Sequence, residues 1–320
     1  MKIFNKLRKK DLSYKDFWER MGSSHDNALS MMDGSPSEEA CQLTGGYMAK
    51  RISNALLLNQ YDVVLELGCG IGRIGREIAP LCEKWFGTDI SKNLIEIARQ
   101  RMSYLRNVEF SALDKTSLHQ FPVHFFDKVY SHAVFIHIDK EDVFLYLREI
   151  ARVLKPGGLL YFDTWNLKNE VGWERWMMEV EVWAQSEQKE RKHVSRNQFC
   201  TPSEISLYVE KSGLQELFVL SDSFWIQEIA LNAEGKGFGT RKAEMRQAIQ
   251  QRMNKIAVNS TLIELFGLQL KLLKGQISPA EFHHSIWNRE ENEEIFFYRQ
   301  WFSALWKKNE KQWGPIPDLN

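Results

Sequence analysis

Short apolar runs alternate with amphipathic segments over the first half of the chain. Runs rich in β-branched and aromatic residues predict strands, and they lie at 62–67, 84–89, 107–114, 125–135 and 159–165. Apolar residues at helical spacing predict helices between them. One lies at 73–83, one follows a Ser91 cap and carries apolar residues within 94–98, and one lies within 141–158, where Pro156 and two glycines stop it. Strands that alternate with helices predict βαβ units and a mainly parallel sheet with helices on both faces.

The pattern changes after Trp165. Residues 166–200 contain no clear strand. Thr201 and Glu204 then predict a capping box that opens a helix ending at Gly213. Two strand-like runs within 214–231 follow, and they predict an antiparallel hairpin at the sheet edge.

From about residue 236 only helices are predicted. One begins at a Thr261–Glu264 capping box and ends at Gly275, a second begins at Ser278, and a third ends near Gly314. We therefore expect an α/β domain at 61–235 between an N-terminal helical cap at 1–60 and a helical C-terminal extension at 236–320. Within the α/β domain, 166–200 is predicted to be an insertion that covers the substrate.

Composition excludes several classes of protein. Lys and Arg number 42 and Asp and Glu also 42, so there is no general attraction to nucleic acid or to an anionic membrane. The four cysteines are scattered, which predicts neither a disulfide framework nor a metal site. No signal peptide and no run long enough for a membrane span is recognised. These features predict a cytoplasmic protein.

A glycine-rich turn joins the first predicted strand to the first helix. In "ELGCGIGR", Gly68, Gly70 and Gly72 let the backbone approach a ligand closely. Arg73 occupies the third glycine position of the dinucleotide pattern G-x-G-x-x-G, which counts against a pyrophosphate cofactor and therefore against a nicotinamide-dependent oxidoreductase. Glu66 is placed to meet a cation, and Asp89, at the end of the next strand, to accept both hydroxyls of a ribose. The turn suits a nucleoside with a positively charged substituent.

With these motifs the chain resembles the class I S-adenosylmethionine-dependent methyltransferases. The matching stretches are "VLELGCGIGR", "GTDIS", "VEFSALD", "FDKVYSHAVFIHI" and "LREIARVLKPGGLLYFDTWN", in family order within about 45–235. The resemblance implies a doubly wound, Rossmann-like sheet of seven strands with the last one antiparallel, and S-adenosylmethionine as cofactor. It also implies a set of cofactor-binding residues: Glu66 on the methionine-amino side, Asp89 at the ribose, Asp114 at the adenine, and Gly68, Gly70, Gly72 and Ile90 around them. Ser131, at the end of the fourth strand, is expected either to contact the cofactor or to pack. Leu113 departs from the glycine that many relatives have there.

Two histidines are candidates for catalysis. Methyl transfer depends mainly on alignment, and a base is needed only if the acceptor arrives protonated. His132 directly follows the fourth strand, at the edge where ligands bind in open α/β sheets. His137 matches a histidine that belongs to a catalytic pair in the phosphoethanolamine methyltransferases, although in many methyltransferases the residue there only packs.

The expected function is methyl transfer to an oxygen or nitrogen of a small-molecule or glycosyl acceptor, with no nucleic-acid substrate. A basic stretch at 189–196 is either a clamp for an acidic acceptor or a solvated surface. The alternatives are a non-catalytic S-adenosylmethionine-binding scaffold and, less favoured, the nicotinamide enzyme. The sequence predicts neither the acceptor nor the oligomeric state.

Overall fold

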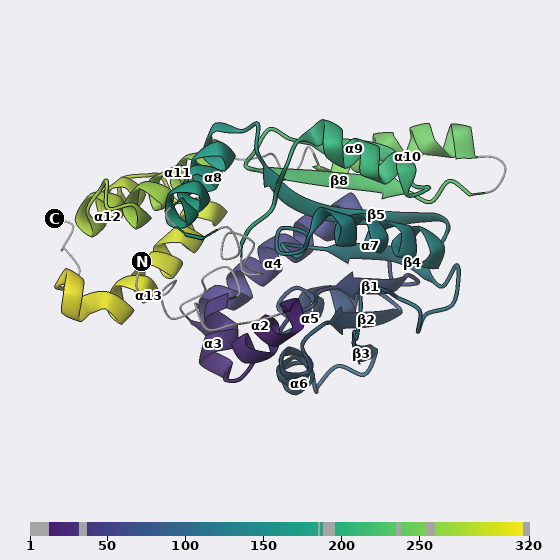
Figure 1. Ribbon diagram of the computed structural model, residues 1–320, viewed down its shortest axis with the longest axis horizontal. Helices are drawn as coiled ribbons and strands as arrows, with labels where there is room; N and C mark the ends of the chain where they lie inside the picture. Colours follow the sequence, from purple (N-terminus) through teal and green to yellow (C-terminus); the bar gives the residue numbers. More distant parts are fainter. Residues whose placement is uncertain are drawn as a thin grey trace.

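An eight-stranded sheet forms the centre of the molecule, which is a computed structural model that describes residues 13–31, 37–184, 186–187, 196–234, 238–253 and 260–315 (Figure 1). The strand order is β3-β2-β1-β4-β5-β8-β7, and β6 pairs with β5 outside this path. The strands are β1 (Val63–Leu67), β2 (Lys84–Asp89), β3 (Val108–Ala112), β4 (Phe126–Ser131), β5 (Leu154–Asn166), β6 (Phe199–Cys200), β7 (Gln215–Leu220) and β8 (Trp225–Leu231).

The pairing confirms the predicted mainly parallel sheet. Strands β1 to β5 pair in parallel, whereas β8 runs antiparallel to both β5 and β7 and forms the predicted edge hairpin. The two-residue strand β6 was not predicted, because a pair this short carries no periodicity.

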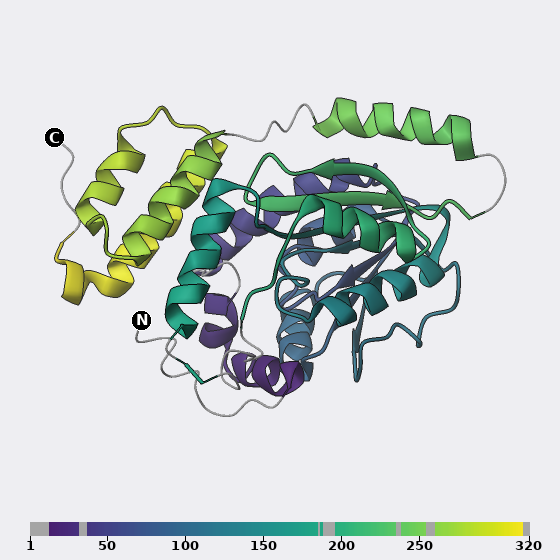
Figure 2. The same cartoon turned by 45° about the horizontal axis from the view of Figure 1, so that its top comes forward.

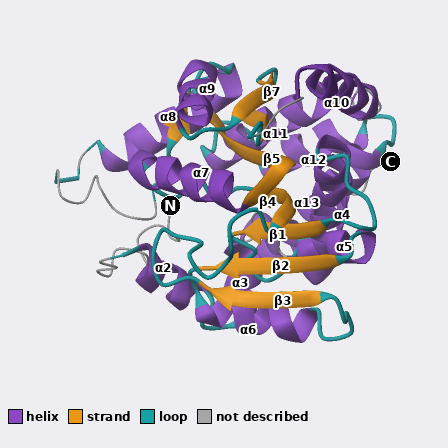
Figure 3. Ribbon diagram, turned by 90° about the vertical axis from the view of Figure 1, so that its right-hand side faces the viewer, coloured by secondary structure: helices purple, strands orange, loops and turns teal. Residues whose placement is uncertain are grey.

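Helices cover both faces of the sheet (Figure 3). On one face, α7 (Lys140–Val153) and α9 (Pro202–Lys211) enclose a core that includes Leu147, Ile150 and Val209. On the other, α4 (Glu38–Ala55), α6 (Lys92–Arg101) and α10 (Phe238–Met253) enclose a second core that includes Ile52 and Ile95. Burial on both faces explains why the central strands read as continuous apolar runs.

Three local predictions need correction. The helix expected at 73–83 is only α5 (Gly75–Ile78) followed by one 3₁₀ turn, η1 (Ala79–Leu81), which contains a proline. Helix α7 ends at Val153, before Pro156, because the chain enters β5 at Leu154. Thr201 does cap α9, but the Glu204 carboxylate accepts hydrogen bonds from Lys140 and Tyr208, and it is these partners that hold it.

Helices at both ends of the chain border the sheet domain (Figure 2). The N-terminal part contains α2 (Tyr14–Met21), α3 (His25–Met31) and α4. The predicted C-terminal helices are present as α11 (Ser260–Leu273), α12 (Pro279–Trp287) and α13 (Glu293–Trp313), around a core of their own that includes Phe282, Phe302 and Trp306. Helix α11 packs against α8 (Glu170–Trp183), and α13 against α4, so the extension is joined to the rest of the protein. The exact division into three domains stays a prediction.

None of the helices within the described ranges combines the length and the apolar character that crossing a bilayer requires.

Candidate functional site

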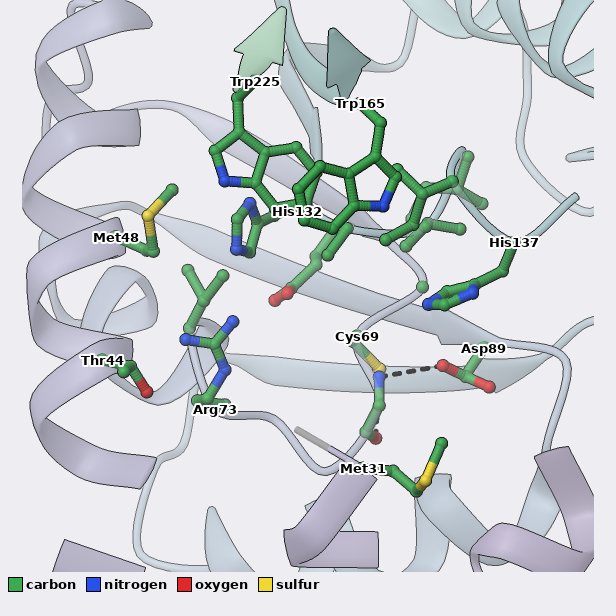
Figure 4. Close-up of a pocket in the computed structure, with 18 of the residues that line it drawn as sticks. Met31, Thr44, Met48, Cys69, Arg73, Asp89, His132, His137, Trp165 and Trp225 are labelled. Carbon is green, nitrogen blue, oxygen red and sulfur yellow. Dashed lines mark hydrogen bonds between the residues drawn. The ribbon is translucent and has the colours of Figure 1, made fainter. Parts of the chain in front are cut away.

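A cavity of about 830 Å³ lies at the carboxyl ends of the central parallel strands (Figure 4). Its lining comes from the end of β1 and the glycine turn after it, the ends of β2 and β5, the loop after β4, the start of β8, and helices α2, α4, α8, α11 and α13. Its size is at the upper end of the usual range for small-molecule pockets. The carboxyl edge of an open parallel sheet is where such ligands bind.

The glycine turn forms the floor of this cavity. The amides of Gly68 and Cys69 donate to the Thr88 carbonyl over 2.7 and 2.8 Å, which ties the turn to β2. Gly68 has φ +78, and a Cβ there would lie 2.2 Å from Val134. Only glycine meets both demands without strain. Gly68 and Gly70 line the cavity.

Gly72 has a different neighbour. Its φ is +74, and a Cβ there would lie 2.5 Å from the Met102 sulfur behind α6. It is not among the residues found to line the cavity, so in this structure it allows close packing of the turn. A direct cofactor contact by Gly72 stays a prediction.

Asp89 holds the next part of the site. Its carboxylate accepts hydrogen bonds of 2.9 Å from the amide of Gly70, drawn as the dashed line in Figure 4, and from the amide of Ser91. Burial raises the pKa of this carboxyl to about 6, against the lowering effect of the amides that it accepts from. Asp89 and the neighbouring Ile90 both line the cavity. A carboxylate fixed in this way keeps acceptor capacity for ligand hydroxyls.

Glu66 lies on the other side of the turn. The Tyr130 hydroxyl donates to its carboxylate over 2.6 Å and in turn accepts from Trp85 Nε1 over 2.9 Å. Burial raises the pKa of Glu66 to about 8, although Tyr130 and the nearby Arg73 guanidinium favour the charged form. Glu66 lines the cavity. A cation bound beside it would favour its ionised form.

Two other predicted residues lie outside the lining. The Ser131 hydroxyl donates to the Leu67 carbonyl over 3.0 Å and joins the ends of β4 and β1. Asp114 is exposed, while its neighbour Leu113 and also Thr116 face the cavity. Contacts from Ser131 and Asp114 to a cofactor therefore stay predictions.

His132 forms a buried pair with Asp163. The distance from His132 Nδ1 to Asp163 Oδ2 is 2.5 Å, and the side chains are 5% and 1% exposed. The other carboxylate oxygen accepts from the amide of Ala133 over 2.8 Å. Ala133 has φ +57, a conformation that residues other than glycine rarely adopt, so Asp163 fixes both the ring and an unusual turn. With Nδ1 engaged, Nε2 of this cavity-lining ring is the nitrogen left for a ligand.

His137 lies in the cavity wall in a different setting. Its ring meets the edge of Trp18 from α2, with centroids 5.1 Å apart. Burial, with a smaller effect from the Arg175 guanidinium, lowers the pKa of His137 to about 4. The ring is therefore neutral near pH 7 and a weak base. Its setting resembles that of a packing residue more than that of a general base.

Sequence reasoning missed Asp163 and the aromatic wall beyond it. Asp163 is an acid within the largely apolar run "LLYFDTW". An acid in a buried strand needs a polar partner, and this requirement was the signal in the sequence that could have identified it. The wall includes Trp165, Phe224, Trp225 and Phe266. The basic stretch at 189–196 falls largely outside the described residues, which resume at Arg196.

Comparison with known proteins identifies the kind of domain that the chain contains. Residues 64–158 match the family model described as a methyltransferase domain. A malonyl-[acyl-carrier protein] O-methyltransferase from Marinomonas is 32% identical over 120 residues, which are 36% of this chain and 42% of that protein. A phosphoethanolamine N-methyltransferase from Plasmodium falciparum is 29% identical over 136 residues, 41% of this chain and 50% of that protein. The chain thus spans half or less of these curated relatives.

One solved structure shows the same fold. It is a putative methyltransferase in complex with the Trm112 methyltransferase activator of Haloferax volcanii, with a TM-score of 0.50, 17% identity, and coverage of 67% of this chain and 97% of that one. Its likeness concerns the fold alone. The family match, together with the strand order and the glycine turn, shows that the chain contains a methyltransferase domain of the class I S-adenosylmethionine-dependent family.

Proposed function

We propose that this protein transfers a methyl group from S-adenosylmethionine to an oxygen or nitrogen of a small-molecule acceptor, and that a hydroxyl is the favoured acceptor group. The observation that carries this proposal is the His132–Asp163 pair, which shares one cavity with the glycine turn and Asp89. A hydroxyl must lose its proton when it is methylated, and a histidine oriented by a carboxylate is suited to take it.

The cofactor fits the groups on the floor of the cavity. The Asp89 carboxylate offers acceptor oxygens to ribose hydroxyls, and the turn leaves room because Gly68 and Gly70 carry no side chains. Glu66 is the acid beside which the positively charged amino group would lie. Ile90 and Leu113 supply apolar surface next to Asp89, against which the adenine ring of the cofactor would lie.

When bound, the cofactor would supply a methyl group on a positively charged sulfur, and transfer of that methyl group to the acceptor oxygen would break the carbon–sulfur bond and leave the neutral thioether S-adenosylhomocysteine. His132 Nε2 takes the hydroxyl proton, and Asp163 stabilises the imidazolium that results. The protein's main contribution is to hold acceptor and base in line and away from water.

The curated relatives support the reaction class but not one acceptor. Their names are malonyl-[acyl-carrier protein] O-methyltransferase, phosphoethanolamine N-methyltransferase and probable fatty acid methyltransferase, so the names differ in the acceptor. A glycosyl acceptor, the absence of a nucleic-acid substrate and a cytoplasmic location rest on the sequence alone and remain predictions.

The direct test is transfer of label from methyl-labelled S-adenosylmethionine to fractionated metabolite extracts. We expect labelled product with wild-type protein and a strongly reduced amount with His132→Ala. Binding of the cofactor with no labelled product from any extract would favour the non-catalytic scaffold. Binding of a nicotinamide cofactor in its place would favour the oxidoreductase.

A further inference from the structure

The cavity continues beyond the glycine turn to a wall made by the C-terminal helices. Helix α11 contributes Phe266, Gln269, Leu270 and Leu273, and α13 contributes Phe296 and Tyr298. These helices follow the methyltransferase match at 64–158 by more than a hundred residues. The extension therefore forms part of the same cavity as the cofactor residues.

The stacked rings of the aromatic wall connect the lining side chains of α11 with the His132–Asp163 pair. Trp165 and Trp225, at facing ends of β5 and β8, stack with centroids 4.4 Å apart (Figure 4). Phe266 of α11 stacks on Phe224 at 4.3 Å and on Trp165 at 5.7 Å. The ring centroids of His132 and Trp225 are 5.9 Å apart. An apolar surface thus runs from His132 to the C-terminal helices.

The electrostatics of the lining do not favour an anionic acceptor. Among the described lining residues the cations are Arg73 and Arg175, and the acids are Glu39, Glu66, Asp89 and Asp142. Arg175 forms an ion pair of 2.9 Å with Glu179, which is itself 4% exposed. Arg73 lies close enough to Glu66 to favour its charged form. Even with Glu66 protonated, the remaining three acids outnumber the two arginines among these residues, so a phosphate or carboxylate would meet net negative charge here.

We propose that the acceptor is a neutral alcohol or phenol with an extended apolar body. Its hydroxyl lies at His132, its body follows Trp165, Trp225 and Phe266, and its far end reaches Leu273 and Phe296 at the mouth. These two side chains are 61% and 41% exposed although they line the cavity, so a long acceptor would cover them. The assignment of the hydroxyl rests on the proposed function. The apolar wall disfavours a glycosyl acceptor, because sugar hydroxyls need polar partners along their length.

A series of 4-alkylphenols tests this proposal. Binding to the full chain is measured by titration calorimetry, from 4-ethylphenol to 4-octylphenol, with and without saturating S-adenosylhomocysteine. We expect affinity to rise about fourfold for each methylene that enters the wall. Phosphoethanolamine and glucose should bind more weakly than every alkylphenol from butyl upward. Affinity independent of chain length, or a preference for phosphoethanolamine, would overturn the proposal.

Two variants test where the alkyl chain of the bound phenol lies. Leu273→Glu and Phe296→Glu place a charge at the mouth on two different helices, and each should weaken 4-octylphenol binding about tenfold while 4-ethylphenol binding changes little. Leu207→Glu is the matched control, because this leucine on α9 is 49% exposed and lies outside the lining. Equal effects of all three variants would contradict the proposed path.

The result is separable from that of the proposed function. If S-adenosylhomocysteine fails to bind while the alkylphenol series behaves as expected, the cofactor assignment is wrong and the apolar wall stands. If S-adenosylhomocysteine binds and the series shows no length dependence, the methyltransferase proposal stands and the acceptor class is wrong.

Discussion

Asp163 Oδ2 lies 2.5 Å from His132 Nδ1, and the pair stands just past the point where β4 and β5 run side by side. The parallel register pairs Ser131 with Phe162, so the residues that follow each of them are neighbours. Asp163 also accepts from the Ala133 amide, which fixes the backbone next to the ring. The pair is therefore a consequence of strand register and not of sequence proximity.

The first prediction follows from this pair. His132→Ala and Asp163→Asn should lower turnover of a weakly acidic alcohol by about 10²–10⁴-fold, the usual contribution of a general base. An acidic phenol, already ionised at the assay pH, should lose much less because no proton needs to be removed. Turnover of both acceptors is measured with labelled cofactor. Equal losses for the two acceptors would show that the pair acts only through structure, and thermal melting checks that both variants fold.

His137 has a different expected outcome. Its pKa of about 4 leaves the ring neutral at working pH, and its contact is the edge of Trp18. His137→Ala should lower the melting temperature but change turnover per folded molecule by less than about threefold, far below the effect of losing a base. His137→Phe, which keeps a ring against Trp18, should restore stability. A hundredfold loss of turnover with normal cofactor binding would make His137 catalytic instead.

The raised pKa of Glu66 leads us to expect proton release on cofactor binding. With a pKa of about 8, its carboxyl is mostly protonated in the free protein at pH 7. A bound ammonium group favours the carboxylate, so up to about one proton should be released per ligand, and affinity should rise with pH up to about 8. Calorimetry in buffers of different ionisation enthalpy measures this number. Glu66→Gln should abolish the release; an unchanged value in that variant would assign the proton to another group.

The buried carboxyl of Glu228, which lies outside the cavity lining, should make the folding stability of the protein depend on pH. It is fully buried in β8, neither of its carboxylate oxygens has a hydrogen-bond partner among the described residues, and burial raises its pKa to about 10. The folded state therefore keeps a proton that the unfolded state loses above its ordinary pKa. Stability should fall by up to about 1.4 kcal/mol per pH unit as pH rises from about 5 to 10.

The matched variants are Glu228→Gln and Glu210→Gln, the second residue being exposed on α9. Denaturant unfolding at several pH values should show that Glu228→Gln gains stability over wild type as pH rises, while Glu210→Gln follows wild type. Parallel curves for wild type and Glu228→Gln would contradict the buried neutral acid.

Much of the fold could be predicted because local patterns carry it. The apolar strands, the Ser91 and Ser278 caps and the glycine stops at Gly213, Gly275 and Gly314 all depend on neighbours in sequence. The errors have local causes as well. Pro80 shortened the helix after the turn, and Lys140 and Tyr208 took the carboxylate that a capping box would have used.

The site could be predicted only where one stretch of chain contains it. The glycine turn follows β1 directly and Asp89 is the last residue of β2, so the sequence could place both at the sheet edge, where Gly68, Gly70 and Asp89 line the cavity. The Asp163 pair depends on the register between two strands, and the aromatic wall depends on how α11 packs beside β5 and β8. Periodicity within a segment contains neither kind of information.

The central claim is that the cavity holds S-adenosylmethionine, and titration calorimetry with S-adenosylhomocysteine tests it most directly. We expect one site per chain and a loss of about 1.5–3 kcal/mol of binding free energy in Asp89→Ala, the scale of a hydrogen bond to a charged group. Because the Asp89 pKa is about 6, affinity should fall more steeply below that pH in wild type than in the variant, which keeps only the pH dependence that Glu66 causes. No binding to the wild-type protein, or equal affinity in a folded Asp89→Ala protein, would contradict the account.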